Sequence, residues 1–221
     1  MIRPGVDFAA INRARRGDLR TRLGLSREDR LVIVPEPVSR RTGAIDVFYA
    51  IVLLNHIEPG WKIILPGRSR ERERILRYAR AIPIETPIVL PNADEPFENL
   101  LAVADVLAMA PPGDVDTTAV AWAMASGTAV IASAVYAVAE MVANRLNGLL
   151  FKRTPGRFLA PALVRCLRDR EGQRKAIETA RGQAYEIFGL RRYLDQTLQL
   201  YDNLSAGRPA TTDITDSAMV G

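Results

Sequence analysis

Short runs of apolar residues recur along the chain, and segments with apolar residues on helical spacing separate them. Each run has the length of a strand, and most are apolar throughout rather than alternating. Such runs are typical of parallel strands that are buried on both faces of a sheet. The predicted strands are residues 31–34, 61–65, 87–90, 106–109, 129–132 and 148–151.

The amphipathic segments between and after these runs predict helices. The predicted helices are residues 45–54, 69–80, 95–104, 117–126 and 138–144, followed by 158–168, 170–183 and 190–204 in succession. Strands that alternate with helices predict a doubly wound parallel α/β sheet with helices on both faces. The last three helices are expected to close the domain after the final strand.

The two ends of the chain lack this pattern. Residues up to about 12 are expected to form an extended entry segment, and residues 16–23 a short helix that ends before Gly24. Residues 206–221 are small and polar without periodicity, which predicts disorder. We therefore divide the chain into an entry segment or linker at 1–14, one domain at 15–205 and a disordered tail at 206–221.

The loops that follow the strands are the expected place for a functional site. Parallel strands all end on the same side of a sheet, and ligands of doubly wound sheets bind beyond those carboxyl ends. The loops in question follow Val34, Leu65, Leu90, Met109 and Ile131.

The charge of the chain does not by itself indicate a partner. Its formal net charge is +5, and all of its basic residues except Lys62, Lys152 and Lys175 are arginines. Arginine is interleaved with Asp and Glu, which is typical of solvated helix faces. The densest cluster, between Arg13 and Arg22, contains no aromatic residue for stacking on bases, so nucleic-acid binding is not expected and stays a minor alternative.

Several classes of protein are disfavoured by what the sequence lacks. No apolar run approaches the roughly 18 residues of a membrane span, although peripheral contact with a membrane stays open. The first residues do not form a signal peptide, and the single cysteine, Cys166, cannot form an internal disulfide. These features predict a cytoplasmic protein. The scattered carboxylates and the lone cysteine predict no metal site.

Several short motifs occur in a specific order along the chain. Residues 4–7 (PGVD) come first, followed by a basic helix and a strand. The later motifs are 43–46 (GAID), 71–74 (ERER), 104–106 (ADV), 123–132 (AMASGTAVIA) and the stretch from Glu140-Met141-Val142 to Asn147-Gly148. In this order and spacing, the chain resembles the second domain of the GT-B glycosyltransferases, the glycosyl transferases group 1 family, from about Pro4 to about Leu204.

The resemblance implies a fold, a substrate class and a missing partner. It implies a Rossmann-like domain that is one half of a GT-B fold and binds a nucleotide-diphosphate sugar, with no other cofactor. It also implies a retaining sugar transfer to an acceptor that binds on a separate N-terminal domain. No such domain is part of the 221 residues, so we expect this chain to be a fragment or a partner subunit that is inactive alone.

Two family glutamates, which contact the donor sugar and the ribose, are replaced in this chain. The aligned residues are Asp114 and Trp122. Asp114 can still accept hydrogen bonds from sugar hydroxyls, whereas an indole only donates and cannot accept bonds from a ribose. Alternatively, Asp114 belongs to simple turn chemistry, and Trp122 either packs on the sheet or stacks on a base or sugar ring.

The turn before the helix at 117–126 is acidic where the family has more glycine. The free N–H groups at Thr117 and Thr118 suit a phosphate, as helix N-termini generally do. Asp116 is expected to cap this helix through its side-chain oxygen. A carboxylate there competes with a diphosphate for the same N–H donors.

The basic residues that neutralise the diphosphate in the family are also replaced in this chain. The resemblance places Glu36, Pro37 and Thr42 at those positions. Arg40 or Arg41 is the candidate replacement, because arginine binds phosphate through two hydrogen bonds. The alternative is a pair of solvated loop arginines.

Four further residues complete the candidate site. Gly67 ends its strand and lets the chain approach a ligand closely. Asn92 and Ala93 follow the third strand, where the family recognises the base through its main chain. Glu140 matches a frequent family glutamate ahead of the Asn147-Gly148 turn.

Two interpretations of function remain from the sequence. In the first, the chain is the donor-binding half of an active glycosyltransferase. In the second, it is a non-catalytic relative that serves as an interaction module, since folds outlast functions. The replaced ribose carboxylate and the acidic turn favour the second interpretation, and the order of the motifs favours the first.

Overall fold

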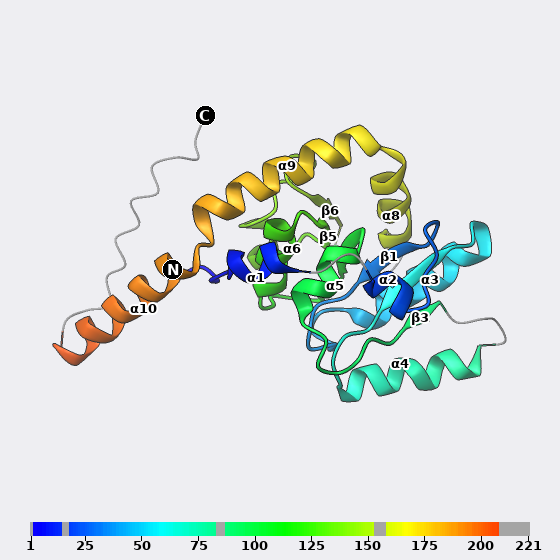
Figure 1. The fold of residues 1–221 in the computed structure, drawn as a ribbon, viewed down its shortest axis with the longest axis horizontal. Helices are drawn as coiled ribbons and strands as arrows, with labels where there is room; N and C mark the ends of the chain where they lie inside the picture. The colour runs from blue at the N-terminus through cyan, green and yellow to red at the C-terminus, as the bar shows by residue number, and fades with distance from the viewer. Residues whose placement is uncertain (1, 15–17, 83–86, 153–157, 208–221) are drawn as a thin grey trace.

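Six parallel strands form a single sheet at the centre of the molecule (Figure 1). The computed structural model describes residues 2–14, 18–82, 87–152 and 158–207. The strand order is β3-β2-β1-β4-β5-β6, so the chain winds first to one side of β1 and then, from β4, to the other. The strands are β1 Arg30–Ile33, β2 Trp61–Ile64, β3 Ile88–Val89, β4 Val106–Met109, β5 Ala129–Ser133 and β6 Leu149–Phe151. The doubly wound, Rossmann-like α/β fold predicted from the sequence is confirmed.

Helices cover both faces of this sheet. They are α1 Phe8–Arg13, α2 Leu19–Arg22, α3 Ala44–Ile57, α4 Arg70–Ala81, α5 Phe97–Val103, α6 Thr118–Ser126, α7 Tyr136–Ala139, α8 Leu159–Arg168, α9 Arg170–Ile187 and α10 Leu190–Ser205. Helices α3, α4 and α8 pack on one face, while α1, α2, α5, α6 and α9 pack on the other. None of the helices in the described ranges has both the length and the apolarity needed to span a bilayer.

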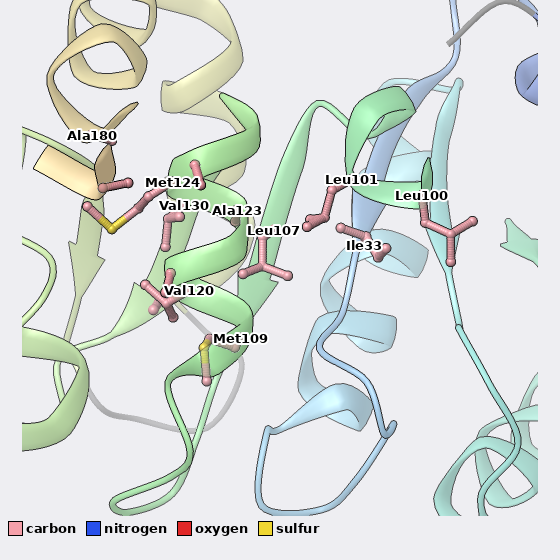
Figure 2. Close-up of a cluster of buried hydrophobic side chains, with 14 of the residues drawn as sticks. Ile33, Leu100, Leu101, Leu107, Met109, Val120, Ala123, Met124, Val130 and Ala180 are labelled. Atoms are coloured by element: carbon pink, nitrogen blue, oxygen red, sulfur yellow. The ribbon is translucent and has the colours of Figure 1, made fainter. Parts of the chain in front are cut away.

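The core consists of two apolar clusters, one on each face of the sheet. Successive strand residues point to opposite faces, so Ile33 of β1 belongs to the cluster under α5 and α6, and Val32 to the cluster under α3. Figure 2 shows the first cluster, with Leu107 of β4 between Leu101 of α5 and Val120 of α6. Because both faces are buried, the strands are apolar throughout, as the sequence indicated.

The beginning of the chain differs from the prediction. An extended entry segment was expected up to about residue 12, but Phe8–Arg13 form helix α1. Asp7 caps this helix by accepting a hydrogen bond from the N–H of Ala10 at 3.0 Å. Ile11 is buried, and the Phe8 ring stacks on Tyr185 of α9 at 4.2 Å between centroids. The helix depends on a partner distant in sequence, which a local pattern does not reveal.

Two other predicted helices are shorter than expected. The helix predicted at 138–144 is the four-residue α7, because the Asn147 side chain accepts the N–H of Ala143 at 2.7 Å and organises a turn instead. The helix predicted at 95–104 begins only at Phe97, directly after Pro96. The tail from 208 onward, and residues 16 and 17 of the predicted helix at 16–23, lie outside the described residues.

Gly43 joins the loop after β1 to the end of β4. It has a left-handed backbone, with φ of 70°, and a Cβ atom built on it lies 2.1 Å from the carbonyl oxygen of Ala110. Next to this contact, the N–H of Ala110 donates to the carbonyl of Thr42 at 2.9 Å. Only glycine fits between these two backbone segments. The contact therefore sets the spacing of the two halves of the sheet at the point where the strand order reverses.

We expect Gly43→Ala to lower the free energy of unfolding by more than about 3 kcal/mol, because left-handed strain and a backbone clash add together. Gly24→Ala is the matched control. Gly24 has a similar φ of 68° but no atom within 4 Å of its added Cβ, so only the strain of about 1 to 2 kcal/mol applies. Urea denaturation of both variants measures the difference, and equal destabilisation would contradict the proposed backbone clash.

Candidate functional site

A cleft of about 610 Å³ opens at the carboxyl end of the sheet, where the strand order reverses between β1 and β4. The loop after β1 forms one wall, and the turn before α6 and the first turns of α5 and α6 form the rest. Its size lies in the range of small-molecule sites, and its position is where doubly wound sheets bind ligands. Its lining comprises Pro35, Glu36, Pro37, Ser39, Arg41, Thr42, Phe97, Glu98, Val115, Asp116, Thr118, Ala119 and Trp122.

Internal hydrogen bonds hold the loop after β1 in place. The Ser39 hydroxyl accepts the N–H of Thr42 at 3.2 Å, and the Thr42 hydroxyl donates back to the Ser39 carbonyl at 2.9 Å. A second tie runs to the neighbouring loop, because the Ser69 hydroxyl donates to the Val38 carbonyl at 2.7 Å. Arg41 is therefore presented to the cleft from a fixed turn. Thr42 is buried and bonded internally, so it does not replace the family cation at its position.

The N-terminus of α6 already has an anionic partner. The Asp116 carboxylate accepts a hydrogen bond from the N–H of Thr118 at 2.7 Å. The predicted hydrogen bond from the first turn to Asp116 is therefore present, but Asp116 lies one residue ahead of the N-cap position, which Thr117 occupies without a side-chain cap bond. Because this N–H lies at the cleft and belongs to the first turn of the helix, a phosphate that binds there has to compete with the carboxylate.

A second cavity, of about 500 Å³, lies on the other side of the same turn. Asp114, Thr117, Tyr136 and Glu140 line it, and Thr118 borders both spaces. The Asp114 carboxylate accepts the N–H of Ala137 in α7 at 3.1 Å. A hydrogen bond to the Glu140 carboxylate raises the pKa of the Tyr136 phenol, and the charge of Glu140 adds to the effect. The structure thus brings together Asp114, Thr117, Thr118 and Glu140 of the predicted site.

The charges that line the main cleft are predominantly negative. Among its described lining residues, Glu36, Glu98 and Asp116 carry carboxylates, and Arg41 carries the positive charge. Loss of solvent around Glu36 raises the pKa of its carboxyl group. This carboxylate lies against Gly67, since a Cβ atom added to Gly67 is 2.3 Å from Glu36 Oε1. An anionic ligand therefore meets one arginine and three carboxylates.

The position of Trp122 suits both roles that the sequence left open for it, packing on the sheet and stacking on a ligand ring. Its side chain is half-buried and packs against the apolar cluster between α6 and the sheet. It also lines the cleft, together with Phe97. Packing on the core and an aromatic surface for a ligand ring are compatible at this position, because Trp122 contacts the core cluster and also lines the cleft.

The remaining predicted residues lie apart from this cleft. Arg40 is exposed on the same turn as Arg41 but lines neither of the two spaces. Gly67 is buried, and its carbonyl accepts a hydrogen bond from the guanidinium of Arg72. Asn92 lines a separate cavity beside β3 and α2, and the exposed Ala93 lines neither the cleft nor its neighbour.

Sequence reasoning missed two residues of the cleft, Phe97 and Glu98. Both lie in the first turn of α5, whose start was predicted two residues too early. The available signal was topological: a helix that follows a parallel strand begins at the same edge of the sheet as the strand ends. Glu98 adds a carboxylate that the family resemblance does not imply.

Comparison with known proteins identifies the family. The family model described as Glycosyl transferases group 1 matches residues 16–183, which is most of the chain. This chain belongs to the glycosyl transferases group 1 family. A search of curated protein sequences found no significant match.

Solved structures of glycosyltransferases share this fold. HepE from Anabaena, determined in complex with UDP-glucose, superposes with a TM-score of 0.76 at 20% identity, over 91% of this chain and 56% of its own. Sucrose-phosphate synthase from Thermosynechococcus elongatus gives 0.79 at 24% identity, over 93% and 52%. The C-terminal domain of LpcC, a group 1 protein from Francisella tularensis, gives 0.66 at 13% identity, over 86% and 96%.

These comparisons place the chain as one half of a GT-B fold. It spans about half the length of HepE and of sucrose-phosphate synthase, but nearly all of the C-terminal domain of LpcC. The resemblance to a C-terminal GT-B domain, inferred from the order of the motifs, is therefore confirmed. At these identities the likeness establishes the fold.

We expect Asp116→Asn to raise the affinity of the chain for pyrophosphate about three- to tenfold, equivalent to about 0.7 to 1.4 kcal/mol. The amide retains the cap on α6 and removes the charge that opposes an anion. Asp94→Asn is the matched control, because Asp94 is exposed and does not line the cleft. Isothermal titration calorimetry measures both, and an equal gain in the two variants would show that only net charge matters.

Proposed function

We propose that this chain is the donor-binding half of a glycosyltransferase and that its cleft binds a nucleotide-diphosphate sugar. The observation that carries the proposal is the cleft of about 610 Å³ at the reversal of strand order, bordered by the first turn of α6. Membership of the group 1 family supports sugar transfer. The binding of UDP-glucose by HepE, which shares the fold, supports this class of donor.

Each part of the donor has a candidate partner in the structure. Arg41 is the cation at the cleft, and its guanidinium suits the diphosphate. Trp122 and Phe97 offer apolar surface to the nucleoside. Asp114 and Glu140 line the adjoining cavity, where their carboxylates suit the hydroxyls of a sugar.

Catalysis in this proposal consists of positioning and charge stabilisation. The glycosidic bond of the donor breaks as a bond to the acceptor forms, and negative charge develops on the leaving nucleoside diphosphate. Arg41 and the N–H groups of α6 stabilise that charge. The proposal includes retention at the sugar carbon, as the family resemblance implies, and a cytoplasmic location with an acceptor-binding domain as partner.

The acidic lining favours a second candidate, a non-catalytic relative that binds nucleotide sugars weakly or not at all. Asp116 already occupies an N–H of α6, and Asp114 occupies an N–H of α7. The N-termini of α6 and α7 thus carry their own carboxylates. In this candidate, the fold persists as an interaction module.

Titration of UDP, GDP, ADP and their sugar conjugates into the chain by calorimetry separates the two candidates. We expect one base to bind and to stabilise the fold by about 2.7 kcal/mol at a hundredfold excess over its Kd.

Arg41→Gln is expected to weaken that binding by at least about tenfold, since a charge-assisted hydrogen bond contributes about 1.5 to 3 kcal/mol. Arg40→Gln is the control and leaves the affinity unchanged. No heat and no thermal shift at millimolar ligand would favour the non-catalytic candidate.

Tryptophan fluorescence tests whether the ligand contacts Trp122. The chain has two tryptophans, and Trp61 is buried in the other core cluster with 1% of its surface exposed. We expect the preferred nucleotide to quench the fluorescence of the native chain and of Trp61→Phe, but not that of Trp122→Phe. Quenching that persists in Trp122→Phe would place the ligand elsewhere.

A further inference from the structure

Helix α3 is apolar on all sides, although one of its sides is open to solvent. Its single carboxylate is Asp46, and none of its 14 residues is a lysine or an arginine. A helix of this composition is usually enclosed on all sides, either by protein or by lipid. The inner side of α3 packs on the sheet, whereas Tyr49, Leu53 and Ile57 expose 47%, 55% and 75% of their surface. These three residues follow one another at a spacing of four, so they form a row along the helix.

Helix α8 extends this apolar surface. A groove of about 740 Å³ lies between α3 and α8, and Leu53, Ile57, Pro161 and Val164 line it. Figure 1 shows α8, α3 and α4 one after another along one side of the molecule, and α3 contacts both of its neighbours. We call these four groove residues, together with Tyr49, the outer patch. Exposed apolar surface that is shared by two helices marks a site of interaction.

Arginines flank the outer patch on the side of α4. Arg70, Arg74 and Arg77 lie on the side of α4 that is opposite to its buried residues Ile75 and Ala79. Their spacing of four and three residues places them in one row along the helix. Helices α3, α4 and α8 together contain seven arginines and three carboxylates, so this layer of helices has a net positive charge.

Two more arginines lie on the other side of the outer patch. Arg165 and Arg168, in the last turn of α8, line the groove. The carboxylate that also lines it, Asp169, caps α9 by accepting an N–H of the first turn at 2.9 Å. Among the ion pairs of the described residues, none includes Arg70, Arg77, Arg165 or Arg168. These four charges are therefore available to an anionic partner.

We propose that the outer patch and the arginines on both sides of it form a docking surface for a membrane that contains anionic lipids. Tyr49, Leu53 and Ile57 enter the boundary between headgroups and acyl chains, as the apolar face of an interfacial helix does. The arginines reach the lipid phosphates, because a guanidinium binds phosphate through two hydrogen bonds while its stem lies along apolar surface. Their positive charge adds attraction to the anionic surface.

The arrangement of charge disfavours other partners. A second copy of this chain that packed its outer patch on the first would bring arginine against arginine in either orientation, since arginines lie on both sides of the patch. A nucleic acid would contact the arginines but would leave the apolar centre without a partner, because Tyr49 provides the only aromatic ring of the outer patch for stacking. An anionic membrane complements both the apolar centre and its basic borders.

Sedimentation of the 221-residue chain with lipid vesicles tests the proposal. We expect phosphatidylcholine vesicles that contain about one third phosphatidylglycerol to bind the chain at least tenfold more tightly than vesicles of phosphatidylcholine alone. Leu53→Glu with Ile57→Glu is expected to lower the partition onto the anionic vesicles at least tenfold, because the carboxylates remove apolar contact and repel the surface. Arg70→Gln with Arg77→Gln is also expected to lower it at least tenfold, since each basic residue near such a surface contributes about 1 kcal/mol, or about fivefold.

A pair of substitutions on another exposed helix is the matched control. Leu198→Glu with Tyr201→Glu changes the net charge equally, and these residues of α10 expose 61% and 65% of their surface. We expect this pair to leave the partition within about threefold of that of the native chain, and thermal melting checks that every variant is folded. Failure of the native chain to bind the anionic vesicles, equal binding to both kinds of vesicle, or equal losses in the α3 and α10 pairs would each overturn the proposal.

Tryptophan quenching locates the contact on the molecule. Leu53→Trp places an indole in the outer patch, and Gln199→Trp places one on α10 as the control. With anionic vesicles whose acyl chains carry bromine, we expect the fluorescence added at position 53 to be quenched and that added at position 199 to be retained. The native Trp61 and Trp122 contribute equally to both variants. Equal quenching at the two positions, or none at position 53, would contradict the proposed docking surface.

Discussion

Gly43 and Ala110 bring the loop after β1 within backbone contact of the end of β4, and the candidate site depends on this approach. The contact, together with the hydrogen bond from Ala110 to Thr42, holds the turn that presents Arg41 to the cleft. It also aligns that turn with the first residues of α6, because β4 leads directly into the turn before the helix. A side chain at residue 43 would separate these walls. The position of the cleft is therefore set by backbone packing, while its chemistry is set by the side chains on the two turns.

Those side chains adapt a donor-binding fold to an unusual balance of charge. Group 1 membership supports the proposed nucleotide-sugar ligand, and the volume of the cleft lies in the range of small-molecule sites. Asp114 and Asp116, however, occupy N–H groups of α7 and α6 that an anion would otherwise use. The same hydrogen bonds that stabilise the local turns therefore reduce the affinity for a diphosphate. The affinity that remains decides whether the chain is the donor-binding half of an active enzyme or a non-catalytic relative.

The sheet and most helices followed from sequence because strands buried on both faces leave continuous apolar runs, as in β4 and β5. Helix α1 did not, since Phe8 relies on Tyr185 far along the chain. Within the site, the family resemblance placed Asp114 and Trp122 near the cleft, and local turn chemistry predicted the hydrogen bond from the first turn of α6 to Asp116. Sequence could not separate Arg41 from Arg40, because adjacent residues on one turn point in different directions. Glu98 was not predicted because it belongs to α5, a helix that is distant in sequence from the two turns of the cleft.

The excess of carboxylates along the cleft has a consequence for the effect of salt on an anionic ligand. Three carboxylates face one guanidinium there, so the local field inside the cleft opposes the entry of a nucleoside diphosphate, although the chain as a whole carries a formal net charge of +5. Dissolved ions screen that field over about 8 to 10 Å at ordinary ionic strength. Moderate salt therefore weakens the repulsion inside this cleft, whereas at a basic phosphate site it weakens an attraction. The ionic strength of the surrounding solution thus becomes part of how the cleft selects what it binds.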